Sequence, residues 1–254
     1  MPHAFELRYE NEVEATPEDV WRAISTGSGL DAWFMGLNEV EEREGGTART
    51  ELPGFPMEST VTVWQPPTRL VTRSPEAEDG SAHSFDYRIE PRGAQTAVRW
   101  IHTGFLGDDN WELEYEGMSE GDPMYFDKLV EYLTYFSGRV ATPVNVFGPG
   151  PMDKDAAWAT YATALGLRGA STVGDRVVLS PADLSPIEGV IDYRSPSFLG
   201  VRSDDAMYRF MHVAWNGTVG LGHHLFAEGL DQPAVEGEWA SWLSGVFAEG
   251  PSAS

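Results

Sequence analysis

Apolar and polar residues alternate along much of the first half of the chain, which predicts an antiparallel β-sheet. Residues 5–13 alternate loosely, as a half-buried strand does. In the clearest case, Phe85, Tyr87 and Ile89 share one face of a strand. Turn signals such as EGG, QPP and PRGAQ separate the segments, so we expect successive strands to pair. The extended segments expected after the first strand and its helices are 37–43, 47–52, 59–64, 69–73, 83–90 and 98–102.

Capping residues and helical spacing mark the helices. In the stretch EATPEDVWRAI, Thr16 is expected to cap a helix that begins at Pro17, where a missing N–H costs nothing. A short second helix is expected at LDAWF, residues 30–34. Apolar residues recur at helical spacing over 126–133, in a long helix that ends near Gly138. One long helix with an apolar face has to cover the sheet, which predicts an α+β fold.

A stretch rich in proline and glycine, TPVNVFGPGP at residues 142–151, interrupts these patterns. No periodicity runs through it, so we expect it to be a boundary between a complete domain over 1–142 and a shorter one over 143–254. A length of 254 residues suits one large domain or two small ones.

The sequence after this boundary repeats the order of features before it. Each half places a capping residue five positions before a tryptophan, in EATPEDVW and in GPMDKDAAW. The separation between matching residues falls steadily, from 137 for Trp21 and Trp158 to 113 for Phe126 and Trp239. A duplicated unit with shortened loops gives such a decrease, so a second, truncated copy of the first domain is expected.

Several motifs of the first half resemble the bacterial relatives of the activator of heat-shock-protein-90 ATPase, the AHSA-type family of the START-like or SRPBCC superfamily. They are VEATPEDVWRAISTGSGLDAWF, VTVWQPPTRLVTRS and TAVRWIHTGF, followed by the long helix. The resemblance implies a helix-grip fold, in which a curved antiparallel sheet wraps a C-terminal helix, often around an apolar cavity. Superfamily members bind lipids, polyketides or hormones, some are cyclases or aromatases, and the eukaryotic namesake stimulates a chaperone. The fold alone transfers none of these functions, and the resemblance supplies no catalytic set.

Composition and charge limit the partners. The formal net charge of −23 opposes binding to nucleic acids and to anionic membranes, which require cationic surfaces. The absence of cysteine excludes disulfides and fits a reducing compartment. No apolar run approaches the roughly 20 residues of a membrane span, and the N-terminus lacks the pattern of a signal peptide. We therefore expect an acidic cytoplasmic protein.

The candidate site is an apolar pocket between the sheet and the long helix. Side chains such as Tyr87, Trp100 and Tyr115 bring polar tips that a solid core would have to satisfy, although aromatic residues at these spacings are also typical of a core. Mostly apolar walls with a few polar groups characterise small-molecule sites. The predicted lining is Trp33, Phe34, Val61, Val63, Phe85, Tyr87, Trp100, His102, Trp111, Tyr115, Tyr125, Phe126, Leu129 and Leu133.

Two histidines, His83 and His102, are expected to face the same side of the sheet. One interpretation is that they shuttle protons or form hydrogen bonds with a ligand. The other is that they are partly buried histidines that are hydrogen-bonded to neighbouring residues. No catalytic residue is assigned, and His102 is the one candidate. Its counterpart in the second half is His223.

Neither a cofactor nor a metal is expected. His223 and His224 are adjacent and point to opposite faces of a strand, so they cannot bind one metal. Glu112 and Glu116 share a helix face, where they serve either as an acid–base pair in a closed cleft or as a solvated surface. The stretch GTVGLG has the wrong spacing for a nucleotide loop.

These observations favour non-catalytic binding or carriage of a small hydrophobic molecule. One alternative is a cyclase- or aromatase-type enzyme that uses the same cavity. The other is a co-chaperone-like module that binds a protein partner through the outer face of the sheet.

Overall fold

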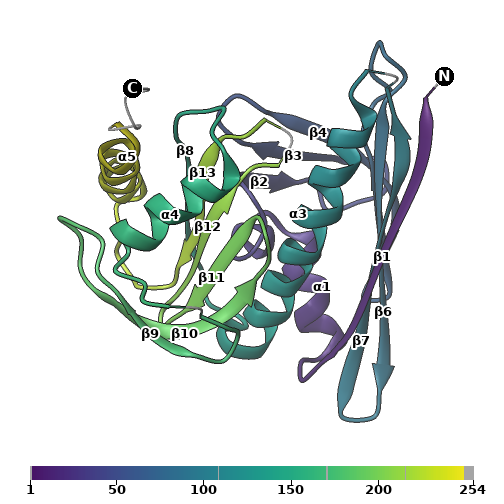
Figure 1. Ribbon diagram of the computed structural model, residues 1–254. Coiled ribbons are helices and arrows are strands. Elements are labelled where there is room, and N and C mark those ends of the chain that lie inside the picture. The colour runs from purple at the N-terminus through teal and green to yellow at the C-terminus, as the bar shows by residue number, and fades with distance from the viewer. Residues whose placement is uncertain (1, 108, 170, 215, 249–254) are drawn as a thin grey trace. The chain divides into compact units, whose positions relative to one another are not determined.

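The first half of the chain folds into an antiparallel sheet with a long helix (Figure 1). The computed structural model describes residues 2–107, 109–169, 171–214 and 216–248, and the chain divides into unit 1, Met1–Ala141, and unit 2, Thr142–Ser254. Among the described residues of unit 1, seven strands lie in the order β1-β7-β6-β5-β4-β3-β2. The six segments predicted after the first helices are all strands, with shifted ends. The strands are β1 (His3–Val13), β2 (Leu37–Val40), β3 (Thr47–Glu51), β4 (Met57–Gln65), β5 (Arg69–Arg73), β6 (Ala82–Arg92) and β7 (Gln95–Leu106).

The predicted helix start at Thr16 and Pro17 is confirmed. Helix α1 (Pro17–Ser25) begins with a capping box, in which the Thr16 hydroxyl accepts a hydrogen bond from the Asp19 N–H at 3.1 Å. The Asp19 carboxylate in turn accepts from the Thr16 N–H at 3.4 Å. Two backbone donors that the helix leaves unpaired are thereby satisfied.

The short second helix lies earlier than predicted. Helix α2 is Gly27–Leu30, whereas residues 31–34 form turns, so the expected helix at LDAWF is wrong. Thr26 starts α2 because its hydroxyl accepts from the Gly29 N–H at 3.0 Å. The carboxylate of Asp31 then accepts from the Asn38 N–H at 2.7 Å, which leads the chain into β2.

Helix α3 (Trp111–Glu131) continues into a π-helical turn, η1 (Tyr132–Phe136), and packs against β1 and β7. Its predicted apolar face is buried at Phe126, Leu129 and Leu133. The helix ends close to Gly138, as predicted, where a φ of +79° favours glycine.

Unit 2 has the same connectivity with one strand fewer. Its described residues form a six-stranded sheet in the order β8-β13-β12-β11-β10-β9, in which the first strand pairs with the last, as β1 pairs with β7. The predicted α+β helix-grip fold with a second, truncated copy is thereby confirmed. The elements are β8 (Thr142–Phe147), α4 (Lys154–Ala164), β9 (Arg176–Leu179), β10 (Ile187–Arg194), β11 (Phe198–Arg202), β12 (Ala206–His212), β13 (Val219–Leu225) and α5 (Gln232–Ala248).

The segment interpreted as a patternless boundary, residues 142–151, contains strand β8. Only the expected lack of regular structure is wrong: β8 is a short strand that is buried over most of its length, so no polar–apolar alternation marks it. It pairs with β13 from Thr142↔Leu225 to Phe147↔Gly220. Pairing with a distant strand therefore determines the structure of this segment, although its prolines and glycines suggest a break in regular structure.

The core of unit 2 is built around its two helices. The carboxylate of Asp153 caps α4 by accepting from the Ala156 N–H at 2.9 Å. Tyr161 on α4 is fully buried, and its hydroxyl donates to the Gly220 carbonyl at 3.0 Å. Helix α5 buries Trp242 and Phe247 in the same cluster.

Candidate functional site

The inner face of the unit 1 sheet carries the candidate site. Strands β6 and β7 pair so that Phe85 lies opposite His102 and Tyr87 opposite Trp100. Because side chains alternate along a strand, these four residues point to one face. Ring contacts with Phe126 of α3 identify this face as the one that the long helix covers.

Trp100 is the centre of an aromatic cluster on this face. It is 1% exposed and stacks on Tyr87 with a distance of 5.6 Å between ring centroids. Phe85 lies at 5.6 Å, Phe126 at 6.2 Å and Trp33 at 6.3 Å. Strand, loop and helix residues that lie far apart in the sequence are thus brought together.

The two tryptophans of the cluster differ in their hydrogen bonds. The Trp33 Nε1–H donates to the Ala23 carbonyl at 2.9 Å. The Trp100 Nε1–H is buried, and it has no hydrogen-bond partner in the part of the chain that the structure describes. Leaving such a donor unpaired costs about 1–3 kcal/mol. Trp100 is therefore a point at which an added oxygen atom would stabilise the cluster.

Five further predicted residues differ in their burial. Val61, Leu129 and Leu133 are fully buried, whereas Phe34 and Tyr125 are half-buried and contact each other at 5.3 Å. The cluster is thus closed at its centre and partly open at its edge.

Val63, Trp111 and Tyr115 lie in more open positions. Val63 follows a β-bulge in β4 and is half-buried. Trp111 stacks on His3 at 4.3 Å, and the Tyr115 side chain is 37% exposed. Trp111 and Tyr115 both belong to the first turns of α3, so the open positions lie mainly at the N-terminal end of this helix.

A chain of hydrogen bonds runs from the buried face of α3 through β7 to the beginning of β6. The His102 Nδ1 lies 2.7 Å from the Asp122 Oδ2, and its Nε2 lies 3.1 Å from the His83 Nδ1. His102 is 3% and Asp122 8% exposed, whereas the His83 side chain is 30% exposed. The His83 Nε2 lies 3.9 Å from the Glu114 Oε1. The predicted common face of His83 and His102 is confirmed.

Burial lowers the pKa of His83 from 6.5 to about 4, with a further contribution from His102, while Asp79 opposes the shift. His83 is therefore neutral at physiological pH. Burial, followed by the charge of Asp122, raises the pKa of the Tyr87 hydroxyl above its ordinary value. Burial, followed by the charge of Asp79, raises the pKa of Glu114.

Sequence reasoning missed Asp122 and two rings of β1. Asp122 lies four residues before Phe126 and so continues the apolar stripe of α3, which is an available signal for a buried carboxylate. Phe5 lies 4.9 Å from the His102 ring and Tyr9 6.1 Å from the Trp100 ring. Their alternation in β1 predicts a shared face, but their neighbours depend on the pairing with β7.

The matching histidine of unit 2 has different partners. His223 contacts Trp239 of α5 at 4.4 Å, so it faces the final helix as His102 does. However, its Nδ1 accepts a hydrogen bond from the Arg209 backbone N–H at 3.0 Å, whereas the His102 Nδ1 donates to the Asp122 carboxylate. The position of the histidine therefore recurs in both units, while the partner of its Nδ1 differs.

Unit 2 carries two grooves along its helices. One, of about 800 Å³, lies between α5 and the loop at 182–184, and the other, of about 380 Å³, lies between α4 and α5. Neither groove includes a predicted lining residue. The larger is lined by Ala182, Asp183, Leu184, Ala234, Gly237, Glu238, Ser241, Trp242, Gly245 and Val246. Over the described ranges, no group of three or more histidine or acidic residues is arranged to hold a metal ion.

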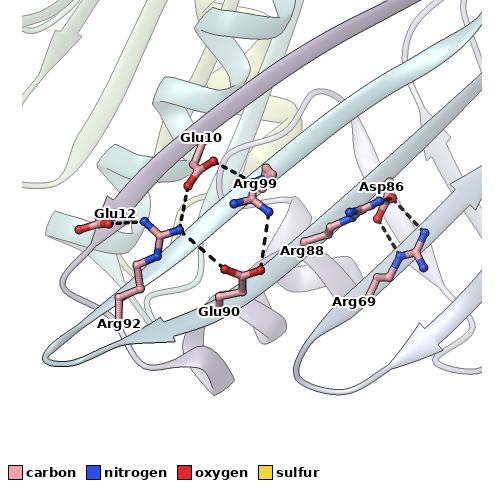
Figure 2. Close-up of polar contacts among 8 residues, drawn as sticks. All are labelled: Glu10, Glu12, Arg69, Asp86, Arg88, Glu90, Arg92 and Arg99. Carbon is pink, nitrogen blue, oxygen red and sulfur yellow. Dashed lines mark hydrogen bonds and ion pairs between the residues drawn. The ribbon is translucent and has the colours of Figure 1, made fainter.

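The outer face of the unit 1 sheet is covered by ion pairs (Figure 2). Asp86 on β6 accepts hydrogen bonds from Arg69 and Arg88, and Arg99 bonds to Glu10 at 2.8 Å. The exposed pairs on this face contribute little to stability, but they leave the face charge-balanced in a chain of net charge −23. The polar outer face contrasts with the aromatic inner face.

Comparisons with known proteins agree with this architecture. The family model described as activator of Hsp90 ATPase homolog 1-like protein matches residues 14–134, which confirms the resemblance drawn from the sequence and identifies unit 1 as a domain of this type. A search of curated proteins finds no match. Among the described helices, none combines the length and the apolar character that a membrane crossing requires.

Several solved structures are similar to the chain. A protein from Mesorhizobium loti is 20% identical, with 51% of this chain and 96% of that one covered and a TM-score of 0.45. The Aha1 dimer from Colwellia psychrerythraea is 18% identical, with the same coverages and a TM-score of 0.44. CalU16 from Micromonospora echinospora is 19% identical, with 52% and 68% covered and a TM-score of 0.41.

Proposed function

We propose that unit 1 binds or carries a small hydrophobic molecule between its sheet and α3, at the aromatic cluster around Trp100. The molecule places an oxygen atom against the Trp100 N–H and an apolar body against neighbouring rings such as Phe85. Predicted residues at this edge, including Phe34 and Tyr125, line the opening. The helix-grip fold of the AHSA type, which commonly accommodates hydrophobic ligands, supports this proposal.

The observation that carries the proposal is the buried, unpaired N–H of Trp100. A core that only stabilises the fold gains nothing from a polar atom without a partner, since such an atom costs about 1–3 kcal/mol. Replacement by phenylalanine would keep the stacking with Tyr87 and remove this cost. A ligand oxygen that accepts a hydrogen bond from the Trp100 N–H would remove this cost in the bound state.

The expected affinity is moderate. A ligand of roughly 20 heavy atoms at about −0.3 kcal/mol per atom gains about −6 kcal/mol, which corresponds to a Kd of tens of micromolar. Trp100 is 1% exposed, so binding requires side chains of the cluster to move. Rings at the half-buried edge, such as Phe34 and Tyr125, are the ones expected to move first.

The test uses a neutral apolar probe, N-phenyl-1-naphthylamine, whose fluorescence rises on transfer from water. We expect the full chain to take up the probe and 2-acetonaphthone, which carries a carbonyl acceptor, to displace it. Trp100→Phe should weaken the binding of 2-acetonaphthone about fivefold, with little effect on the binding of naphthalene. Trp64→Phe is the matched control, because Trp64 packs on Trp21 at 4.8 Å and lies on β4, three strands from β7 in the sheet order. Absence of probe uptake, or equal effects of both substitutions, would refute the proposal.

The His102–Asp122 pair favours a second candidate, an acid–base enzyme of the cyclase or aromatase type. A carboxylate that holds a histidine in one orientation is typical of general-base sites. In that case His102→Gln should abolish turnover of a bound polyketide-like substrate and leave its binding intact. Loss of binding together with turnover would instead assign His102 to the binding site.

A further inference from the structure

We propose that Asp122, His102 and His83 together fix the hydrogen-bonding polarity of the site, so that it selects hydrophobic molecules that carry a hydrogen-bond donor, such as a phenolic hydroxyl. This inference rests on the proposed function, since it concerns the ligand of the same site. Three observations support it: the distances along the chain, the burial of its inner end and the partial exposure of its outer end.

The polarity follows from the inner end of the chain. A carboxylate carries no hydrogen and can only accept, so the contact of 2.7 Å with Asp122 places a hydrogen on the His102 Nδ1. In the proposed tautomer, the His102 Nε2 carries the lone pair. The contact of 3.1 Å requires one hydrogen, which the His83 Nδ1 supplies. The remaining nitrogen, the His83 Nε2, is therefore an acceptor.

The acceptor is maintained by the surroundings of His83. In the described ranges, the charged or titratable groups that act on it are His102, Asp79 and Glu114. Burial and His102 oppose a positive charge on His83 more strongly than Asp79 favours one. The other acceptor near the His83 Nε2 is the Glu114 carboxylate, at 3.9 Å, which also binds donors and repels anions. A hydroxyl group therefore meets two acceptors at this position, whereas a methoxy group or a carboxylate meets no donor.

The end of the ligand that lies away from His83 meets a hydrogen-bond donor instead of an acceptor. His83 pairs with Gly104, four residues along β7 from Trp100, so the backbone positions of Trp100 and His83 are roughly 13 Å apart along the strands. The Trp100 N–H requires an acceptor. The molecule that suits both ends is flat and aromatic, with a carbonyl at one end and a hydroxyl at the other.

The experiment compares 6-hydroxy-2-acetonaphthone with 6-methoxy-2-acetonaphthone, which share the carbonyl and differ only in the donor. Both are measured by displacement of N-phenyl-1-naphthylamine from the full chain. We expect the hydroxy compound to bind about fivefold more tightly. Equal affinities, or tighter binding of the methoxy compound, would overturn the inference while leaving the proposed function intact. Absence of binding by either compound counts against the proposed function.

Asp122→Asn tests the relay itself. The amide is similar in size but can donate to the His102 Nδ1, which reverses every hydrogen bond of the chain and turns the His83 Nε2 into a donor. We expect the preference for the hydroxy compound to vanish or invert, an outcome that simple destabilisation does not produce. Glu112→Gln, an exposed carboxylate on the same helix, is the control and should keep the preference.

Nitrogen-15 NMR of the histidine rings reports the same polarity without any ligand. At pH 7 the hydrogens should lie on Nδ1 of both His102 and His83, and Asp122→Asn should move them. A hydrogen on the His83 Nε2 of the unsubstituted protein would overturn the inference even if neither compound binds.

Discussion

The low pKa of His83 predicts a pH-dependent loss of stability that one substitution removes. His83 has a pKa of about 4 in the folded chain, against 6.5 for an unperturbed histidine. Between these values the unfolded chain binds a proton that the folded chain does not, so acid favours unfolding. The stability linked to His83 is fully present above pH 6.5 and is lost as the pH falls through about 4.

The magnitude follows from the two pKa values. Their difference corresponds to about 3 kcal/mol in the free energy of unfolding if the group is fully shielded from water. The His83 side chain is 30% exposed, so solvent screens part of this effect. We therefore expect about 1–2 kcal/mol between pH 7 and pH 4.

Urea unfolding of the full chain and of His83→Gln, followed by tryptophan fluorescence at pH steps from 4 to 7.5, measures this contribution. The many carboxylates contribute to both curves, so the difference between the two proteins isolates His83. The free energy of unfolding should fall more steeply with acid in the unsubstituted protein. His3→Gln removes another histidine of unit 1 and should not flatten the curve. Parallel curves for the unsubstituted protein and His83→Gln would refute the assigned environment, as would an NMR titration of His83 near pH 6.5.

Two further predictions concern the frame of each unit. Thr16→Ala removes the side-chain acceptor of the α1 capping box and should lower the free energy of unfolding by about 1 kcal/mol, whereas Thr16→Ser keeps a hydroxyl acceptor and should retain the stability. Equal losses in the two variants would contradict the capping role. Tyr161→Phe removes the hydroxyl that donates to the buried Gly220 carbonyl and should lower the free energy of unfolding, measured with heat or urea, by about 1–3 kcal/mol. The control Tyr115→Phe, at an exposed position, should change it negligibly. A loss no larger than that of the control would exclude this bond as a stabilising contact.

Within the site, the sequence predicts which rings share a face but not which of them meet. Alternation places Tyr87 and Phe85 on one side of β6, and helical spacing places Phe126 on the buried stripe of α3. The contacts of these rings with Trp100 depend on the register between β6 and β7, which hydrophobic pattern alone does not set. Asp122 is the clearest case, since its role appears only once His102 is known to lie 2.7 Å away.

The sequence by itself determined the local and repetitive features of this protein: the caps at Thr16 and Asp153, the alternating strands, the apolar face of α3 and the recurrence of one order of elements in two units. These features follow from interactions between residues near in the chain, or from periodicities of 2 and 3.6 that need no partner. Only the tertiary structure decided that residues 142–147 form a strand, because β8 is recognised by its pairing with β13 and not by any alternation. It also decided the chain from Asp122 to His83, because three side chains from separate elements acquire a hydrogen-bonding direction only when packing brings them together.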